Sequence, residues 1–298
     1  MNITEIFREK MACDGIVTKE PIISDGELHR IHVEGDKAGS RNGWYVLYAD
    51  RVPSGAFGSW KADISKRWCI KSHIRMTRNE WLEYRRKMED AHHQRKQAKA
   101  YEHECAGKRA RGIWRYSHVA NLNHPYFVKK AVSPFSARQR GDVLVLPIMD
   151  FQNIIWSLQF IDANGSKFLL SGGAKKSNFI PVNGTLDSNP ILICEGWATG
   201  ATLATDNPFS CVIAAIDANN LEPVASKIRL YKPRSKIIIC ADDDRMTQGN
   251  PGQTKARQAA IVSGALLSSP QWPINAPESL TDFNDLSCWL ESNKEVLA

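Results

Sequence analysis

Two short apolar runs that each end in carboxylates constrain the fold more than any other feature of this sequence. The first run, 191–194, is followed by Glu195 and Gly196, and the second, 237–241, is followed by the acidic triplet 242–244. Short runs rich in β-branched residues and bounded by turn signals are typical of buried strands. The sequence therefore predicts two buried strands that each deliver acidic side chains at their carboxyl end.

The segment between these runs predicts how the two strands are related in space. A third apolar run, 211–216, and two stretches of helical pattern lie between them, which indicates βαβ units on a mostly parallel sheet. Ligands of such sheets bind beyond the carboxyl ends of the strands, so Glu195, Asp242 and Asp244 are expected to converge at one edge. Crowded carboxylates raise one another's pKa unless a cation neutralises them. Their hard oxygen atoms suit Mg²⁺ or Mn²⁺.

The order apolar strand, Glu-Gly, apolar strand, Asp-x-Asp resembles the TOPRIM domain, which bacterial-type DNA primases, topoisomerases, some nucleases and recombination mediators share. Three segments resemble the TOPRIM primases of phages, plasmids and other mobile elements in particular: ICEGWATGATL (193–203), CADDD with NPGQTKARQAA (within 240–260), and TDFNDL (281–286). The resemblance is specific in this part of the chain and much weaker over residues 1–140.

The resemblance implies a DNA primase-type nucleotidyltransferase that synthesises short primers on single-stranded DNA from NTPs or dNTPs. In this reaction a 3′-hydroxyl attacks a nucleotide α-phosphate, which requires positioning and charge neutralisation more than covalent help. Glu195, Asp242 and Asp244 are expected to be catalytic and to hold Mg²⁺ or Mn²⁺, and Glu195 is expected to help deprotonate the hydroxyl. Asp243 should point the other way along a continuing strand, within reach of a metal only through water.

One position departs from the family pattern. Cellular primases usually carry an acidic residue four positions after the motif glutamate, and this chain has Thr199 there. Mobile-element versions share this feature, so the departure leaves activity possible while the number of metals stays open. Asp282 and Asp285 either complete the acidic site or cap a C-terminal helix.

Positive charge is concentrated in one part of the chain. The formal net charge is +7, yet residues 66–140 contain 19 Lys and Arg against 6 Asp and Glu, which leaves the remainder acidic. A basic segment beside an acidic metal site suits a polyanionic partner, although a solvated helix face has the same composition. The expected nucleic-acid contacts are Arg85, Arg86, Lys96, Lys129 and Lys130.

Phosphate contacts are expected at two further places. Gly172 and Gly173, followed by Lys175 and Lys176, combine backbone flexibility with two positive charges, so this segment can hold phosphate, although an ordinary loop has the same look. Lys255 falls in the first turn of the helix that follows the acidic triplet and is a second candidate for a phosphate contact.

The expected fold class is α/β. It comprises a TOPRIM domain with a central, mostly parallel sheet, preceded by an antiparallel β subdomain, a basic helical arm and a small β-rich N-terminal domain. The expected boundaries are 1–76 for the N-terminal domain, 77–140 for the arm, 141–187 for the β-rich part of a primase core, and 188–298 for the TOPRIM domain with its C-terminal helix. Thr77 and Glu80 form a capping-box pattern at the start of the arm.

Several classes of protein are disfavoured. The seven cysteines contain no Cys-x-x-Cys pair, which argues against a zinc ribbon. No apolar run approaches ~20 residues and no signal-peptide core is visible, so we expect no membrane partner and a location in the cytoplasm of a bacterial host cell. No Gly-x-x-x-x-Gly-Lys-Ser/Thr loop is present, so any replicative helicase is expected to be a separate partner.

Two alternatives to a primase stay open on the sequence alone. The same carboxylates serve hydrolysis in a metal-dependent TOPRIM nuclease, which needs no groove for incoming nucleotides. The chain also fits a non-catalytic nucleic-acid-binding replication factor with a vestigial acidic site. A topoisomerase is less favoured, because no flanking module to supply a tyrosine nucleophile is recognisable.

Overall fold

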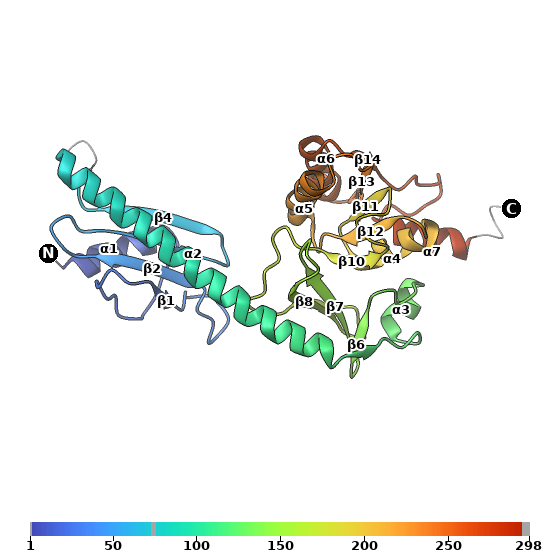
Figure 1. Cartoon of the computed structure of the whole chain (residues 1–298), viewed down its shortest axis with the longest axis horizontal. Helices are drawn as coiled ribbons and strands as arrows, with labels where there is room; N and C mark the ends of the chain where they lie inside the picture. The colour runs from blue at the N-terminus through green and yellow to red at the C-terminus, as the bar shows by residue number, and fades with distance from the viewer. Residues whose placement is uncertain (1, 73–75, 294–298) are drawn as a thin grey trace. The chain divides into compact units, whose positions relative to one another are not determined.

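The computed structural model describes residues 2–72 and 76–293 (Figure 1). The chain separates into two compact units, Met1–Tyr101 and Glu102–Ala298, which we call the N-terminal and C-terminal units. The long helix α2 (Arg78–Arg115) contributes residues to both units. None of the helices in these described ranges is both long enough and apolar enough to cross a membrane.

The N-terminal unit is built on a four-stranded antiparallel sheet. Its strands occur in the order β1 (His29–Ile31), β2 (Gly43–Tyr48), β3 (Ser54–Ser59) and β4 (Ile64–Cys69), so β4 lies at an edge. Side chains alternate between the two faces of a strand, and both faces of this sheet are covered. One face packs on α1 (Ile3–Cys13) and the other on the first part of α2.

The two faces of this sheet form separate hydrophobic cores. Phe57 packs with Phe7 of α1 on one side, while Trp44 packs with Tyr84 and Met88 of α2 on the other. Trp44 and Phe57 are almost fully buried. They therefore serve as core residues, and base stacking by either ring is excluded in this fold.

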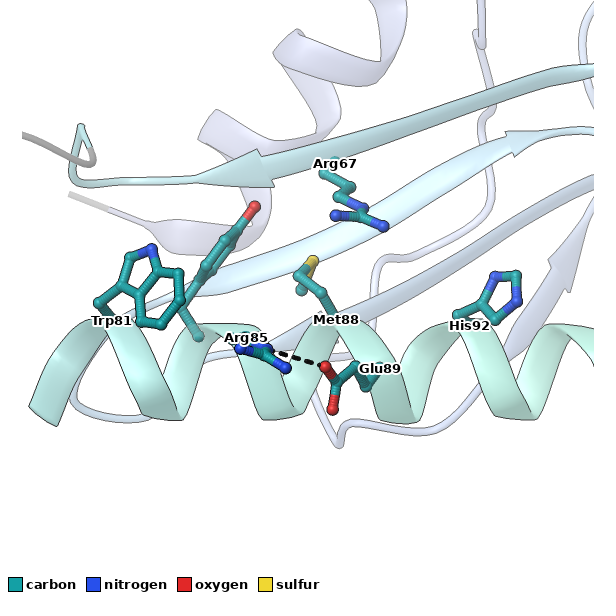
Figure 2. Close-up of a pocket in the computed structure, with 7 residues that line it drawn as sticks. Arg67, Trp81, Arg85, Met88, Glu89 and His92 are labelled. Atoms are coloured by element: carbon teal, nitrogen blue, oxygen red, sulfur yellow. Dashed lines mark hydrogen bonds and ion pairs between the residues drawn. The ribbon is translucent and has the colours of Figure 1, made fainter.

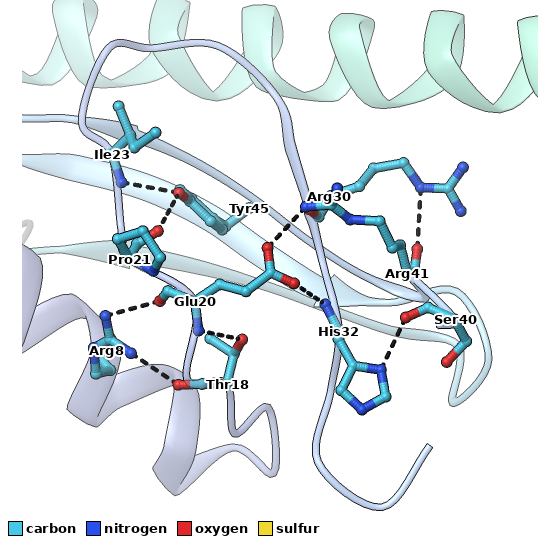
Figure 3. Close-up of polar contacts among 10 residues, drawn as sticks. All are labelled: Arg8, Thr18, Glu20, Pro21, Ile23, Arg30, His32, Ser40, Arg41 and Tyr45. Atoms are coloured by element: carbon cyan, nitrogen blue, oxygen red, sulfur yellow. Dashed lines mark hydrogen bonds and ion pairs between the residues drawn. The ribbon is translucent and has the colours of Figure 1, made fainter. Parts of the chain in front are cut away.

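Side-chain hydrogen bonds hold the irregular segment that precedes β1 (Figure 3). Arg8 donates to the carbonyls of Thr18 and Glu20 at 2.8 and 2.9 Å. The Glu20 carboxylate in turn accepts from the His32 backbone N–H at 2.8 Å and from Arg41 at 2.7 Å. This network replaces the ladder hydrogen bonds that a strand would supply, because buried backbone groups need partners.

The predicted capping box is present at the start of α2. The Glu80 backbone N–H donates to Thr77 Oγ1 at 3.3 Å, and the Glu80 carboxylate accepts from the Thr77 N–H at 3.0 Å. A hydrogen bond from Lys71 and these contacts lower the pKa of Glu80 to about 2. The carboxylate is therefore charged at neutral pH and satisfies the first turn of the helix.

Thr77→Ala is expected to lower the free energy of unfolding of the N-terminal unit by about 1 kcal/mol, because the first turn loses its hydroxyl acceptor. Urea unfolding followed by circular dichroism measures this change. Thr77→Ser retains the acceptor and should behave like the wild type, so equal losses in both variants would contradict a capping role.

The C-terminal unit begins with an antiparallel meander. Its strands occur in the order β5 (His118–Val119), β6 (Arg138–Arg140), β7 (Val143–Met149), β8 (Ile155–Ile161) and β9 (Lys167–Leu169). The short helix α3 (Pro125–Lys130) lies between β5 and β6 along the chain. Short turns join β7, β8 and β9, as the turn signals at 150–153 and 162–165 between the apolar runs predict.

A second sheet of this unit carries the apolar runs at 191–194 and 237–240. The strand order is β10 (Ile180–Asn183), β12 (Cys211–Ala214), β11 (Ile191–Cys194), β13 (Ile237–Cys240) and β14 (Leu266–Ser268). All neighbouring pairs are parallel except β10 with β12. The predicted α/β fold with a central, mostly parallel sheet is therefore confirmed.

Helices cover both faces of this sheet (Figure 1). The helices α4 (Trp197–Asp206) and α7 (Phe283–Ser292) pack on one another, and α4 lies against the core that includes Leu192 and Val212. The helices α5 (Ala218–Tyr231) and α6 (Pro251–Ser263) cover the other face. The predicted C-terminal helix ends at Ser292 within the described residues, and positions 294–298 lie outside them.

Candidate functional site

Strand pairing brings the two acidic motifs together. In the central sheet β11 and β13 are parallel neighbours, with Cys194 paired to Cys240 at their carboxyl ends. Glu195 directly follows the first strand, and Asp242 and Asp244 follow the second after Ala241. The motif carboxylates therefore lie at one edge of the sheet, where open α/β sheets bind ligands.

The carboxylates at this edge influence one another electrostatically. Burial raises the pKa of Asp242 most, followed by the charges of Glu195, Asp282 and Asp244, and together they bring it to about 8. The pKa of Glu195 is raised by burial and then by Asp244 and Asp217. Shifts of this kind mark a site at which negative charge is crowded and poorly solvated.

Asp244 is oriented by the N-terminus of α6. Its carboxylate accepts a hydrogen bond from the Gly252 backbone N–H at 2.9 Å, and its own N–H donates to Asn250 Oδ1 at 2.9 Å. A Cβ atom at position 252 would lie 2.8 Å from the Asp242 carbonyl oxygen and 2.9 Å from the Asp244 carboxylate. Glycine is required there because no side chain fits between the acidic motif and the helix.

Asp243 is held by different groups from its two neighbours. One carboxylate oxygen accepts from Trp272 Nε1 at 2.8 Å and the other from the Asn250 side-chain amide at 2.6 Å. Both oxygens are thus engaged by protein donors. This arrangement suits a structural support for the loop better than direct metal coordination.

A second acidic motif reaches the site from the end of the chain. Asp282 caps α7 by accepting from the Asp285 N–H at 2.8 Å, and its other oxygen accepts from Thr199 Oγ1 at 3.0 Å. Thr199 stands where cellular primases usually carry an acidic residue. The tertiary structure therefore places a carboxylate from the 281–286 motif against this position.

Lys167 is a site residue that the sequence motifs did not single out. It begins β9 in the antiparallel meander, and its charge lowers the pKa of both Glu195 and Asp242. Its Nζ atom lies 3.8 Å from the point that a Cβ at Gly196 would occupy. The only signal in the sequence is a lone lysine at the start of a short apolar run, which is too common to identify a site.

The glycine- and lysine-containing segment 172–176 lies next to this edge of the sheet. Lys175 forms an ion pair with Asp217, the residue whose charge also raises the pKa of Glu195. Gly172 has a φ of +77°, and a Cβ at Gly173 would lie 2.0 Å from Ser157 Oγ. The segment follows β9, so it connects to the strand that carries Lys167.

The other predicted contact residues lie in three places. Lys130 pairs with Asp285 at 3.1 Å, and its carbonyl accepts from the Asn284 amide at 2.7 Å, which ties α3 to the 281–286 motif. Lys129 and Lys255 are exposed. Because α6 begins at Pro251 with Asn250 as its N-cap, Lys255 is the fifth residue of the helix and lies beyond the first turn, in which the sequence had placed it. Exposed positions on α2 within the N-terminal unit hold Arg85, Arg86 and Lys96.

The donor set at this edge suits a hard divalent cation. Asp242 Oδ1 is buried and has no hydrogen-bond partner among residues 2–72 and 76–293, and several further carboxylates surround it. A buried oxygen of this kind is costly unless a cation or a donor satisfies it. In the same described ranges no three His, Cys, Asp or Glu side chains stand in ligand positions around one point. The buried oxygen and the neighbouring carboxylates therefore suit a cation, although the described side chains do not converge on a single point.

The carboxylates at this edge lie within a segment that matches a known domain family. Residues 190–289 match the Toprim domain family. Two proteins of Escherichia coli, both named DNA primase TraC, are each 30% identical to the chain, over 280 and 302 residues. These alignments cover 90% and 96% of this chain, but the chain spans only 26% and 20% of the length of those relatives.

Solved structures of low similarity include the primase fragment of the bacteriophage T7 primase-helicase protein, with 17% identity, a TM-score of 0.40 and coverage of 61% of this chain and 78% of that one. A DNA primase domain from Pseudomonas aeruginosa has 14% identity, a TM-score of 0.35 and coverage of 54% of each chain. The Toprim match and the similarity to DNA primase TraC together identify residues 190–289 as a Toprim domain in a chain that resembles the TOPRIM primases of mobile elements.

Proposed function

We propose that this chain is the catalytic part of a DNA primase that synthesises short primers on single-stranded DNA during replication of a phage, plasmid or other mobile element. The observation that carries the proposal is the convergence of Glu195, Asp242 and Asp244 at one sheet edge, with Asp282 and Lys167 contributed from outside the two motif strands. The similarity to proteins named DNA primase over most of this chain supports the same assignment.

In the proposed mechanism, Asp242 and Asp244 hold Mg²⁺ or Mn²⁺, and Glu195 and Asp282 complete the acidic edge. When bound, the metal would polarise the attacked phosphate and stabilise the leaving oxygens. The Gly252 N–H orients Asp244, so that this carboxylate is in place before the substrate arrives. Preorganised groups of this kind need no rearrangement during the reaction.

The proton and phosphate steps fall to other side chains of the chain. The raised pKa of Glu195 suits a general base for the attacking 3′-hydroxyl, because a carboxylate of higher pKa is the stronger proton acceptor. Lys167 is placed to neutralise charge on the incoming triphosphate. The lysines at 175, 176 and 255 are proposed as further phosphate contacts of an NTP or dNTP, and Lys129 and Lys130 as contacts of the template.

The proposal is tested by the products formed from single-stranded DNA, labelled NTPs or dNTPs and Mg²⁺ or Mn²⁺, separated on a denaturing gel. Short new oligonucleotides are expected from the wild type and should be absent from an Asp242→Ala, Asp244→Ala double variant. Asp206→Ala is the matched control, because Asp206 is an exposed carboxylate at the far end of α4.

Other outcomes of this experiment point to the alternative functions. Shortened template without new product would replace the primase by a metal-dependent nuclease. Unchanged DNA binding in both variants with neither product would leave a non-catalytic nucleic-acid-binding factor. Either result would overturn the proposal that this chain synthesises primers.

A further inference from the structure

A pocket of about 480 Å³ lies within the N-terminal unit, between β4 and one face of α2 (Figure 2). Its helical lining recurs at intervals of three and four residues, which places the side chains on one face of the helix. This lining includes Trp81, Tyr84, Arg85, Met88 and His92, and β4 contributes Arg67. The volume falls within the range of about 300–1,000 Å³ that is typical of ligand pockets.

The base of the pocket is buried and its rim is exposed. Tyr84 and Met88 are buried and belong to the core that α2 forms with the sheet. Trp81, one turn before Arg85, remains 40% exposed. A large aromatic surface is therefore presented to solvent on a packed support, at the edge strand of the sheet.

Two arginines line the pocket together with this aromatic surface. Arg67 points into the pocket from β4 in Figure 2. Among the described residues, no acidic side chain pairs with it. Arg85 bonds through its Nε to Glu89 at 3.0 Å, and its guanidinium carbon lies 5.7 Å from the centre of the Trp81 ring. The pocket thus combines one exposed indole with two guanidinium groups and a single carboxylate.

We propose that this pocket binds one base of a single-stranded DNA segment, stacked on Trp81, with the adjoining phosphate held by Arg67. Exposed aromatic rings interleaved with cationic side chains are the combination that recognises unpaired nucleic acid. This proposal rests on the proposed function, which makes single-stranded DNA the template. It adds a contact site for that DNA outside the Toprim domain. Of the nucleic-acid contacts predicted on α2, Arg85 lines the pocket, whereas Arg86 and Lys96 do not.

Binding of a fluorescently labelled oligo(dT) to the full chain, measured by anisotropy at several salt concentrations, tests this proposal. The solution contains a chelator and no nucleotides, so the result does not depend on primer synthesis. Trp81→Ala is expected to weaken binding about tenfold at every salt concentration, because it removes a stacked base contact. Trp81→Phe retains an aromatic face and should recover most of the affinity, which separates lost stacking from misfolding.

Arg67→Ala has a different expected signature. The slope of log K against log salt should fall in magnitude by about 0.7, the value for one lost phosphate contact on a single strand. Lys37→Ala removes one positive charge from an exposed turn outside the pocket and should leave both affinity and slope unchanged. Equal losses in the Arg67 and Lys37 variants would indicate a general charge effect and overturn a specific contact.

Photochemical crosslinking gives a second readout. An oligo(dT) that carries one 5-iododeoxyuridine is expected to crosslink to the peptide containing Trp81, and Trp81→Ala should abolish that product. Crosslinks confined to other peptides, together with unchanged affinity in the Trp81 variants, would overturn the proposal and leave a peptide or small molecule as the occupant. Failure of primer synthesis with a normal Trp81 crosslink would count against the proposed enzyme alone.

Discussion

Replacing Asp242 by Asn is expected to lower primer synthesis more than about 10²-fold, and at the same time to stabilise the metal-free protein. The amide has nearly the same shape as the carboxylate but cannot supply a charged metal ligand, so the loss of activity follows from lost transition-state charge stabilisation. The gain in stability follows because Asp242 is largely buried among Glu195, Asp282 and Asp244, where its charge is unfavourable.

The stability effect has a defined dependence on pH. The pKa of Asp242 is raised from 3.8 to about 8, so the folded state favours the protonated form. Its contribution to stability is present below about pH 4 and is lost as the pH rises towards about 8. Metal-free wild type should therefore lose stability across this range, whereas Asp242→Asn should lose less.

Thermal unfolding in a chelator at pH 5 and pH 8, repeated with excess Mg²⁺, measures both effects. At pH 8 the metal-free variant is expected to melt a few degrees above the wild type, where about 1 kcal/mol corresponds to roughly 2–4 °C. Mg²⁺ at about 100 times its dissociation constant should stabilise the wild type by about 2.7 kcal/mol and the variant by much less. Asp206→Asn is the control, and equal Mg²⁺ effects in all three proteins would show that the acidic edge binds no metal.

Replacing Lys167 by Gln is expected to lower the rate of primer synthesis by about 10²–10³-fold, the typical cost of removing one preorganised charge-stabilising group. The Lys167 Nζ atom lies 3.8 Å from the point that a Cβ at Gly196 would occupy, beside the motif glutamate, and in the proposed mechanism it neutralises charge on the incoming triphosphate. The loss should appear in the rate at saturating nucleotide and, to a smaller extent, in the nucleotide concentration required for half-saturation.

Two further variants sharpen this test. Lys167→Arg retains the charge and should recover part of the activity. Lys236→Gln removes an exposed lysine just before β13, at the opposite end of the strand from the acidic motif, and should leave the rate unchanged. Wild-type rates in Lys167→Gln would remove this residue from the proposed mechanism.

Much of the architecture that positions the site follows from local sequence. The apolar runs at 191–194 and 237–240 are short, β-branched and separated by helical stretches, and parallel strands with right-handed crossovers are the stable way to bury them. Glu195 and Asp242 must then share an edge, because side chains that follow neighbouring parallel strands emerge on the same side of the sheet. The meander before the Toprim domain and the capping box at Thr77 were predictable for similarly local reasons.

What the sequence by itself determined, then, is the alternation of apolar strands and helices along the Toprim domain and the identity of the motif carboxylates, whereas the order β10-β12-β11-β13-β14 in the sheet came from the structure. Only the tertiary structure decided which distant groups join them: Asp282 against Thr199, Lys167 beside Glu195, and Trp272 holding Asp243. The pocket around Trp81 also depends on the tertiary structure, because an edge strand and one face of a helix form it together. Periodicity encodes which face of an element is buried, but contacts between elements far apart in the chain depend on packing, which no local pattern records.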